Sequence, residues 1–161
     1  MASNQIRGLS LTRPWPFAFH HGKRVENRSW RPPGKLVGCY IALHAAKSFS
    51  EEDREFIAMV TGLDVPPKSD CPHSEIFAVA RWNGVIILPE PETDEEGLIP
   101  TGQGLADNQS QWFFGPYGWL LEEYVQLPEP VKATGARGLW DIKPDVLVEV
   151  RKQFQIAMGV K

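Results

Sequence analysis

The sequence lacks the features that mark several large classes of protein. None of its apolar runs approaches the roughly 20 residues that a membrane helix needs. Its N-terminus does not have the charged and then apolar layout of a signal peptide. It holds only two cysteines, Cys39 and Cys71, and no zinc-spaced set of Cys and His. We therefore expect a cytoplasmic protein with free thiols, no bound metal and no membrane partner.

The short motifs of common catalytic machinery are missing as well. The chain contains no phosphate-binding P-loop, no G-x-G-x-x-G, no H-E-x-x-H and no G-x-S-x-G. These absences argue against an ATPase, a dehydrogenase and a serine hydrolase. No cofactor is expected.

Acidic residues are almost absent from the first 49 positions. Glu26 is the only acid there, against eight Lys and Arg residues. Residues 50–100 hold twelve acids and three basic residues, and the whole chain has a formal net charge of −3. A polarised molecule of this kind can offer a positive face to an anionic ligand. Because charge also fluctuates along any sequence, composition alone does not decide between the two interpretations.

With 161 residues, 42% hydrophobic residues and six Trp, the chain is most simply one globular domain over residues 1–161. Apolar patterning and turn residues predict strands at 8–12, 23–30, 36–44, 76–88, within 112–131, and at 138–142. Helices are predicted over 17–22, from Ser50 to Gly62, and over 145–158. This order favours an α+β fold with a closed or nearly closed sheet and helices on its flanks.

Two of these elements carry finer predictions. Ser50 should cap its helix, with an apolar stripe of Phe56, Met59, Val60 and Leu63 facing the core. The strand over 76–88 is interrupted at Asn83-Gly84, which predicts a hairpin turn or a bulge. Residues 89–111 lack periodicity and are expected to form a long acidic loop.

The segment 23–30, KRVENRSW, brings cations, a carboxylate and an indole close together. Strand alternation puts Lys23 on one face and Glu26, Arg28 and Trp30 on the other. A pair between Glu26 and Arg28 would fix the guanidinium in one orientation. Lys23 lies where the turn meets the strand, which suits a phosphate clamp or a proton carrier. The alternative is a solvated, charged edge strand that protects against aggregation.

Aromatic residues supply the second set of candidates. Trp15 lies between two prolines beside the basic strand and is the best candidate for stacking on a base. Trp119 and Trp140 lie inside apolar strands and are expected in the core. His44 ends a predicted buried strand with Lys47 nearby, which favours a core or rim histidine over a catalytic one.

The stretch LSLTRPWPFAFHHGKRVENRSW, residues 9–30, resembles the opening of the ASCH domain, a branch of the PUA-like superfamily. The pattern G-K-x-x-E-x-R of that domain is matched by Gly22, Lys23, Glu26 and Arg28. Residues 41–47, 112–131 and 137–142 are similar to later segments of such proteins. The resemblance covers about residues 8–143. It implies a PUA-like mixed β-barrel of about six strands with flanking helices, followed here by the helix at 145–158.

The resemblance implies an RNA-binding or nucleotide-binding module whose partner is single-stranded RNA, a nucleotide or a modified nucleoside. The ligand-binding residues would come from the aromatic and basic positions Trp15, Lys23, Arg24, Arg28, Trp30, His44, Lys47 and Tyr117.

The alternative is a hydrolase, either an amidohydrolase acting on acylated cytidine or a metal-independent ribonuclease. Lys23 would then be catalytic, with Glu26 as its proton shuttle. In the small amidohydrolases of the family, a Thr stands where this chain has Glu26. Their distal catalytic Glu has no unambiguous match among Glu90, Glu92, Glu95 and Glu96.

Overall fold

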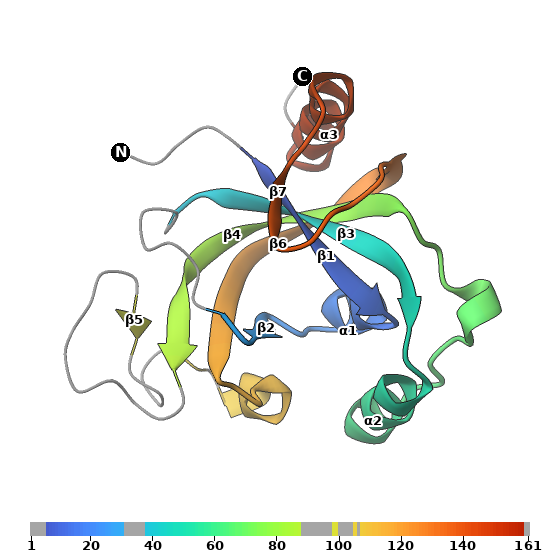
Figure 1. Cartoon of the computed structure of the whole chain (residues 1–161), viewed down its shortest axis with the longest axis vertical. Coiled ribbons are helices and arrows are strands. Elements are labelled where there is room, and N and C mark those ends of the chain that lie inside the picture. The colour runs from blue at the N-terminus through green and yellow to red at the C-terminus, as the bar shows by residue number, and fades with distance from the viewer. Residues whose placement is uncertain (1–5, 31–37, 88–97, 100–104, 106, 160–161) are drawn as a thin grey trace. The chain divides into compact units, whose positions relative to one another are not determined.

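A computed structural model of the chain describes residues 6–30, 38–87, 98–99, 105 and 107–159. In chain order, the helices and strands are β1 (Arg7–Arg13), α1 (Trp15–His20), β2 (Val25–Arg28), β3 (Tyr40–Phe49), α2 (Glu51–Thr61), β4 (Glu75–Ile87), β5 (Leu98–Ile99), β6 (Tyr117–Lys132), β7 (Leu139–Asp141) and α3 (Pro144–Ala157) (Figure 1). Two short 3-10 helices cover Lys68–Asp70 and Asp107–Trp112. No helix in the described ranges is long and apolar enough to span a bilayer.

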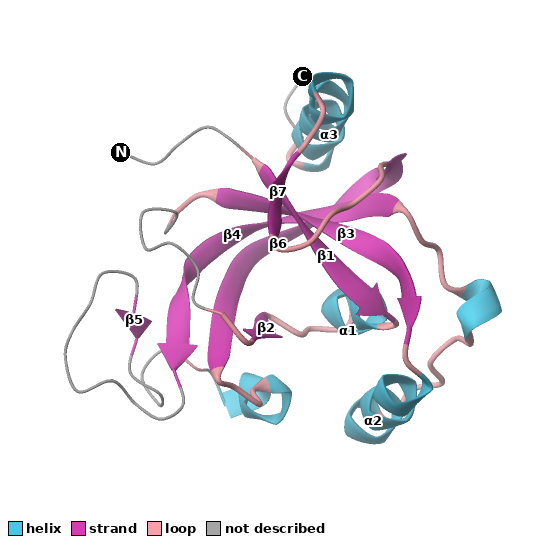
Figure 2. Cartoon of the chain, viewed as in Figure 1, coloured by secondary structure: helices cyan, strands magenta, loops and turns pink. Residues whose placement is uncertain are grey.

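The strands form one mixed sheet in the order β2-β6-β4-β3-β1-β7, with β5 paired to β4 (Figure 2). β1 runs parallel to β3 and antiparallel to β7, and β2 runs antiparallel to β6. A mixed sheet with three helices is an α+β fold. The fold class predicted from the sequence is therefore confirmed.

The described residues fall into two compact units. The first unit draws on residues 23–40 and 81–124, and the second on residues 6–22, 41–80 and 125–161. Strands β3, β4 and β6 each pass from one unit into the other along the chain. The assignment of the whole chain to a single domain stays a prediction.

Helix α2 begins where the sequence predicts, but its buried side differs. The Ser50 hydroxyl accepts a hydrogen bond from the Asp53 amide at 3.1 Å, and Gly62 ends the helix with φ of 70°. Ile57 is the buried residue, whereas Met59 is 74% exposed and Leu63 is 41% exposed. Met59 lies two positions from Ile57, about 200° around the helix, so it points away from the packed side. The predicted stripe is wrong for Met59 and Leu63, because the helix buries the face of Ile57, while Phe56 and Val60 are partly buried.

The strands depart from prediction mainly in their ends. β2 covers only Val25–Arg28, and β3 continues past His44 to Phe49. β4 runs through Asn83-Gly84 without a hairpin, and Gly84 has φ of 141° while its carbonyl accepts a 2.6 Å hydrogen bond from the Trp82 indole. The predicted loop at 89–111 lies mostly outside the described residues, and its described parts include β5 and most of the 3-10 helix at Asp107–Trp112.

A partly buried chain of polar contacts joins β1, β3 and β7 in the second unit. The Trp140 indole donates to the Ser10 hydroxyl at 3.2 Å, and that hydroxyl lies 3.0 Å from His44 Nδ1. His44 Nε2 lies 2.7 Å from the Ala133 carbonyl oxygen and donates to it, so Nδ1 is the acceptor for Ser10. Burial lowers the pKa of His44, which keeps the ring neutral in this arrangement.

Gly8 makes a close approach that depends on having no side chain. A Cβ at this position would lie 2.4 Å from the Trp140 ring. We predict that Gly8→Ala lowers the free energy of unfolding by about 1–3 kcal/mol, because the ring or the strand must shift. Urea unfolding followed by tryptophan fluorescence measures the change. In a Trp140→Leu background the penalty should shrink, and an equal penalty in both backgrounds would contradict the assigned clash.

Candidate functional site

The pairing of β2 with β6 sets the positions of the motif residues in the first unit. Glu26 lies opposite Trp119, and Arg28 lies opposite Tyr117. Residues directly opposite in an antiparallel pair share a face, with Cβ atoms about 4.5–5.5 Å apart. One face of this ladder therefore carries Glu26 and Arg28 together with two aromatic residues of β6.

Residues 112–115, just before β6, pack against the opposite face of the ladder and hydrogen-bond to it. The Asn27 side chain donates to the Trp112 carbonyl at 2.8 Å and accepts from the Phe114 and Gly115 amides at 2.8 and 3.2 Å. A Cβ on Gly118, the partner of Asn27, would lie 2.7 Å from the Phe113 ring. This packing fixes the ladder from one side, so the Glu26 face is held in a defined orientation.

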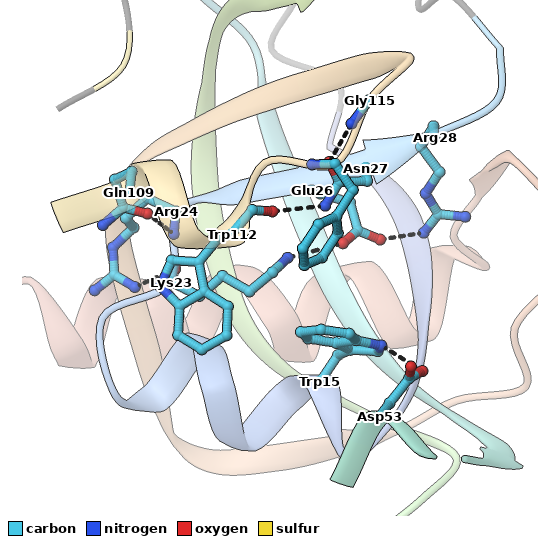
Figure 3. A network of polar contacts seen from close by, with 11 residues as sticks. Trp15, Lys23, Arg24, Glu26, Asn27, Arg28, Asp53, Gln109, Trp112 and Gly115 are labelled. Carbon is cyan, nitrogen blue, oxygen red and sulfur yellow. Dashed lines mark hydrogen bonds and ion pairs between the residues drawn. The ribbon is translucent and has the colours of Figure 1, made fainter. Parts of the chain in front are cut away.

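Glu26 lies between two cations. Its Oε1 accepts from Lys23 Nζ at 3.1 Å, and its Oε2 is 2.9 Å from Arg28 Nη2 (Figure 3). The Lys23 side chain is 1% exposed, that of Glu26 is 12% exposed and that of Arg28 is 21% exposed. We call these three residues the Glu26 cluster. Its two cations and one carboxylate leave it with a net charge of +1.

Burial controls the ionisation of the lysine in the Glu26 cluster. Removal from water lowers the pKa of Lys23 below its ordinary value, because the buried charged form loses its hydration. Glu26 opposes this shift through its charge and its hydrogen bond, and the charge of Arg28 adds to it. The carboxylate is therefore the group that stabilises an ammonium ion at this buried position.

Arg24 lies in the same segment but not in the Glu26 cluster. Its amide donates to the Gln109 side chain at 2.7 Å, and its guanidinium donates to the Lys23 carbonyl at 2.6 Å. The guanidinium also lies over the Tyr124 ring, 4.2 Å from the centroid. Figure 3 shows Arg24 beside Gln109, on the side away from Arg28.

Two further sequence candidates lie near the Glu26 cluster along the β2–β6 ladder. Trp30 packs edge-on against Trp119, with ring centroids 4.9 Å apart, and Tyr117 is the cross-strand partner of Arg28. Trp119 is fully buried, while Arg28, Trp30 and Tyr117 are partly exposed. We call these three partly exposed residues the Arg28 face.

Trp15, His44 and Lys47 belong to the second unit, so they are described separately. The Trp15 indole donates to Asp53 at 2.8 Å, and its ring centroid lies 6.3 Å from that of Phe56. His44 is buried, with both ring nitrogens engaged in the protein, and Lys47 is exposed. Binding of a ligand by these three residues stays a prediction.

The structure corrects the predicted placement of Lys23. Strand alternation assigned it to the face opposite Glu26, yet its Nζ contacts the Glu26 carboxylate. The reason is that β2 starts only at Val25, so Lys23 precedes the strand and follows Gly22, which has φ of 107°. Its long side chain then reaches Glu26 from outside the ladder. The predicted pair between Glu26 and Arg28 is confirmed.

The residues that support the site are not apparent from the sequence. Asn27 lies inside the motif and binds three backbone groups, but its spacing in the sequence does not show this. Gln109 is buried and holds the Arg24 amide, although it lies in the stretch expected to be a loop. No pattern in the sequence joins residue 109 to residue 24, so only the structure could find this contact.

Within the described ranges, no three His, Cys, Asp or Glu residues are grouped so that they could hold a metal ion. No family model matches the chain. No curated protein matches it either. Among solved structures, it is similar to a serine-to-alanine mutant of ZmASCH from Zymomonas mobilis, with 12% identity over 94% of this chain and 98% of that chain and a TM-score of 0.45.

The Glu26 cluster predicts an asymmetry between two substitutions. Glu26→Gln removes the carboxylate shared by two cations and leaves a buried ammonium without it, which should cost about 3–5 kcal/mol of unfolding free energy. Lys23→Met keeps the volume and leaves the contact between Glu26 and Arg28, so it should cost about 1 kcal/mol or less. Urea denaturation of both variants tests this. Equal losses would contradict the central position of Glu26.

Proposed function

We propose that this chain is a binding module of the ASCH type that takes single-stranded RNA or a nucleotide on the Arg28 face. The observation that carries the proposal is that two cations of the motif, Lys23 and Arg28, both contact the carboxylate of Glu26. Arg28 is the most exposed member of this cluster and the one that a ligand reaches from solvent.

Arg28 has the chemistry for an anionic or base-edge contact. A guanidinium presents a planar fork of donors that fits phosphate oxygens or a base edge, and Glu26 holds one of its nitrogens at 2.9 Å. An oriented fork loses less conformational freedom when it binds. The rings of Tyr117 and Trp30 provide surfaces on which bases stack, worth roughly 1–3 kcal/mol per base.

Lys23 acts in this proposal as a positioning residue. With a side chain 1% exposed, it does not reach a ligand at the surface. Its ammonium instead holds Oε1 of Glu26, which leaves Oε2 directed at Arg28. The protein thus uses one cation to orient the carboxylate and the other to contact the ligand.

A second candidate is the hydrolase that the resemblance implies. The lowered pKa of Lys23 and its contact with Glu26 favour it, because an ammonium group with a lowered pKa gives up its proton more readily and can then take part in proton transfer. The substrate carbonyl would have to reach the buried Nζ. Incubation with N4-acetylcytidine distinguishes the two, since a binding module releases no cytidine.

We predict that Arg28→Ala weakens binding of a fluorescein-labelled 10-nucleotide single-stranded RNA by about tenfold. The loss of one phosphate contact should also reduce the slope of log K against log salt by about 0.7. Fluorescence anisotropy at several salt concentrations measures both quantities.

Two variants control this experiment. Arg151→Ala removes an exposed arginine from α3 and should leave affinity nearly unchanged. Arg28→Lys keeps the charge without the fork and should restore the salt slope more than the affinity. If the unmodified protein and Arg28→Ala bound the RNA with equal affinity, the Arg28 face would not be the binding site.

A further inference from the structure

The second unit contains a pocket that the proposed function does not use. It has a volume of about 260 Å³ and opens between α1, the start of β4, the Pro66–Pro72 stretch and β6. Every residue that lines it belongs to the second unit. Binding in this pocket is therefore independent of the Arg28 face.

The walls of this pocket are apolar and stiff. Five of its lining residues are prolines, among them Pro14 and Pro16, whose rings fix the backbone dihedral φ. Phe17 and Phe77 add aromatic surfaces, and the His20 ring packs edge-on against Phe77 with centroids 5.2 Å apart. Because these groups are held by the backbone or by one another, the pocket is formed before a ligand enters.

The volume of the pocket limits the size of its ligand. An apolar cavity of about 150 Å³ is enough to hold benzene. At about 260 Å³ the pocket has room for one aromatic ring and a short chain of two or three further atoms.

One carboxylate in the wall gives the pocket its chemical preference. Glu75 is partly buried, and no hydrogen bond or ion pair of its side chain is found among the described residues. Burial raises its pKa, while the positive charges of His73 and Lys132 oppose that shift. Both of these residues are exposed, so solvent screens their charges.

Arg13 also lines the pocket, but its guanidinium is already engaged. It donates to the Lys68 and Cys71 carbonyls at 3.2 and 2.7 Å and to the Lys47 carbonyl. The residue is 4% exposed. These backbone dipoles offset part of its charge, and its burial keeps it from serving as the anchor for an anion. Glu75 is the one carboxylate among the residues that line the pocket, so a cationic ligand would depend on it.

We propose that the pocket binds a small organic ammonium ion with an aromatic body. The ring would lie against Phe17 and Phe77, and the ammonium group would donate to the Glu75 carboxylate. A charge-assisted hydrogen bond of this kind is stronger than a neutral one. A cation beside aromatic rings gains a further attraction from their faces.

Phenethylamine is a suitable probe, with 2-phenylethanol as its neutral analogue and phenylacetate as its anionic one. In titrations of the whole chain followed by 1H–15N NMR, phenethylamine should shift the amide signals of Phe17 and Phe77. We expect it to bind about tenfold more tightly than 2-phenylethanol, and phenylacetate to bind most weakly. Glu75→Gln should reduce the affinity for phenethylamine to that for the alcohol.

The matched control is Glu55→Gln, which removes an exposed carboxylate from α2 outside the pocket and should change nothing. Equal affinities for the amine and the alcohol would overturn the proposal and leave an apolar pocket. Tighter binding of phenylacetate would assign the pocket to anions through Arg13. Failure of phenethylamine to shift the pocket signals would also overturn it.

Discussion

The carboxylate of Glu26 is the group on which the candidate site depends. It is the only acid in the first 49 residues, and it accepts from Lys23 at 3.1 Å and pairs with Arg28 at 2.9 Å. A buried ammonium is costly unless a carboxylate compensates it. Without Glu26, Lys23 just before β2 and Arg28 at the end of β2 would lose the carboxylate that they share.

The two cations of the cluster differ in exposure, which the sequence alone could not show. The buried cation, Lys23, holds the carboxylate, while the more exposed cation, Arg28, lies on the face of the ladder that also carries Tyr117. Asn27 fixes the same strand from its other side through three backbone contacts. Alternation along four residues of β2 thus gives one face that anchors the strand and one that carries charge.

Local chemistry explains which features could be predicted from the sequence. The Ser50 cap, the strand at β1 and the pair between Glu26 and Arg28 follow from spacing within a few residues, and all are confirmed. The buried face of α2 depends on what packs against Ile57, and the role of Gln109 depends on a contact 85 positions away. Strand periodicity misplaced Lys23 because β2 begins two residues after it. Errors of this kind arise where tertiary contacts, rather than local pattern, decide the outcome.

A direct titration of the Lys23 ammonium tests the central claim most sharply. NMR of the chain with 13C- and 15N-labelled lysine reports its pKa, which should lie below the ordinary value of 10.5. Glu26→Gln should lower that pKa further, because the carboxylate stabilises the charged form, and Arg28→Ala should raise it by removing a neighbouring positive charge. A pKa of Lys23 at or above 10.5 that neither substitution changes would contradict the account.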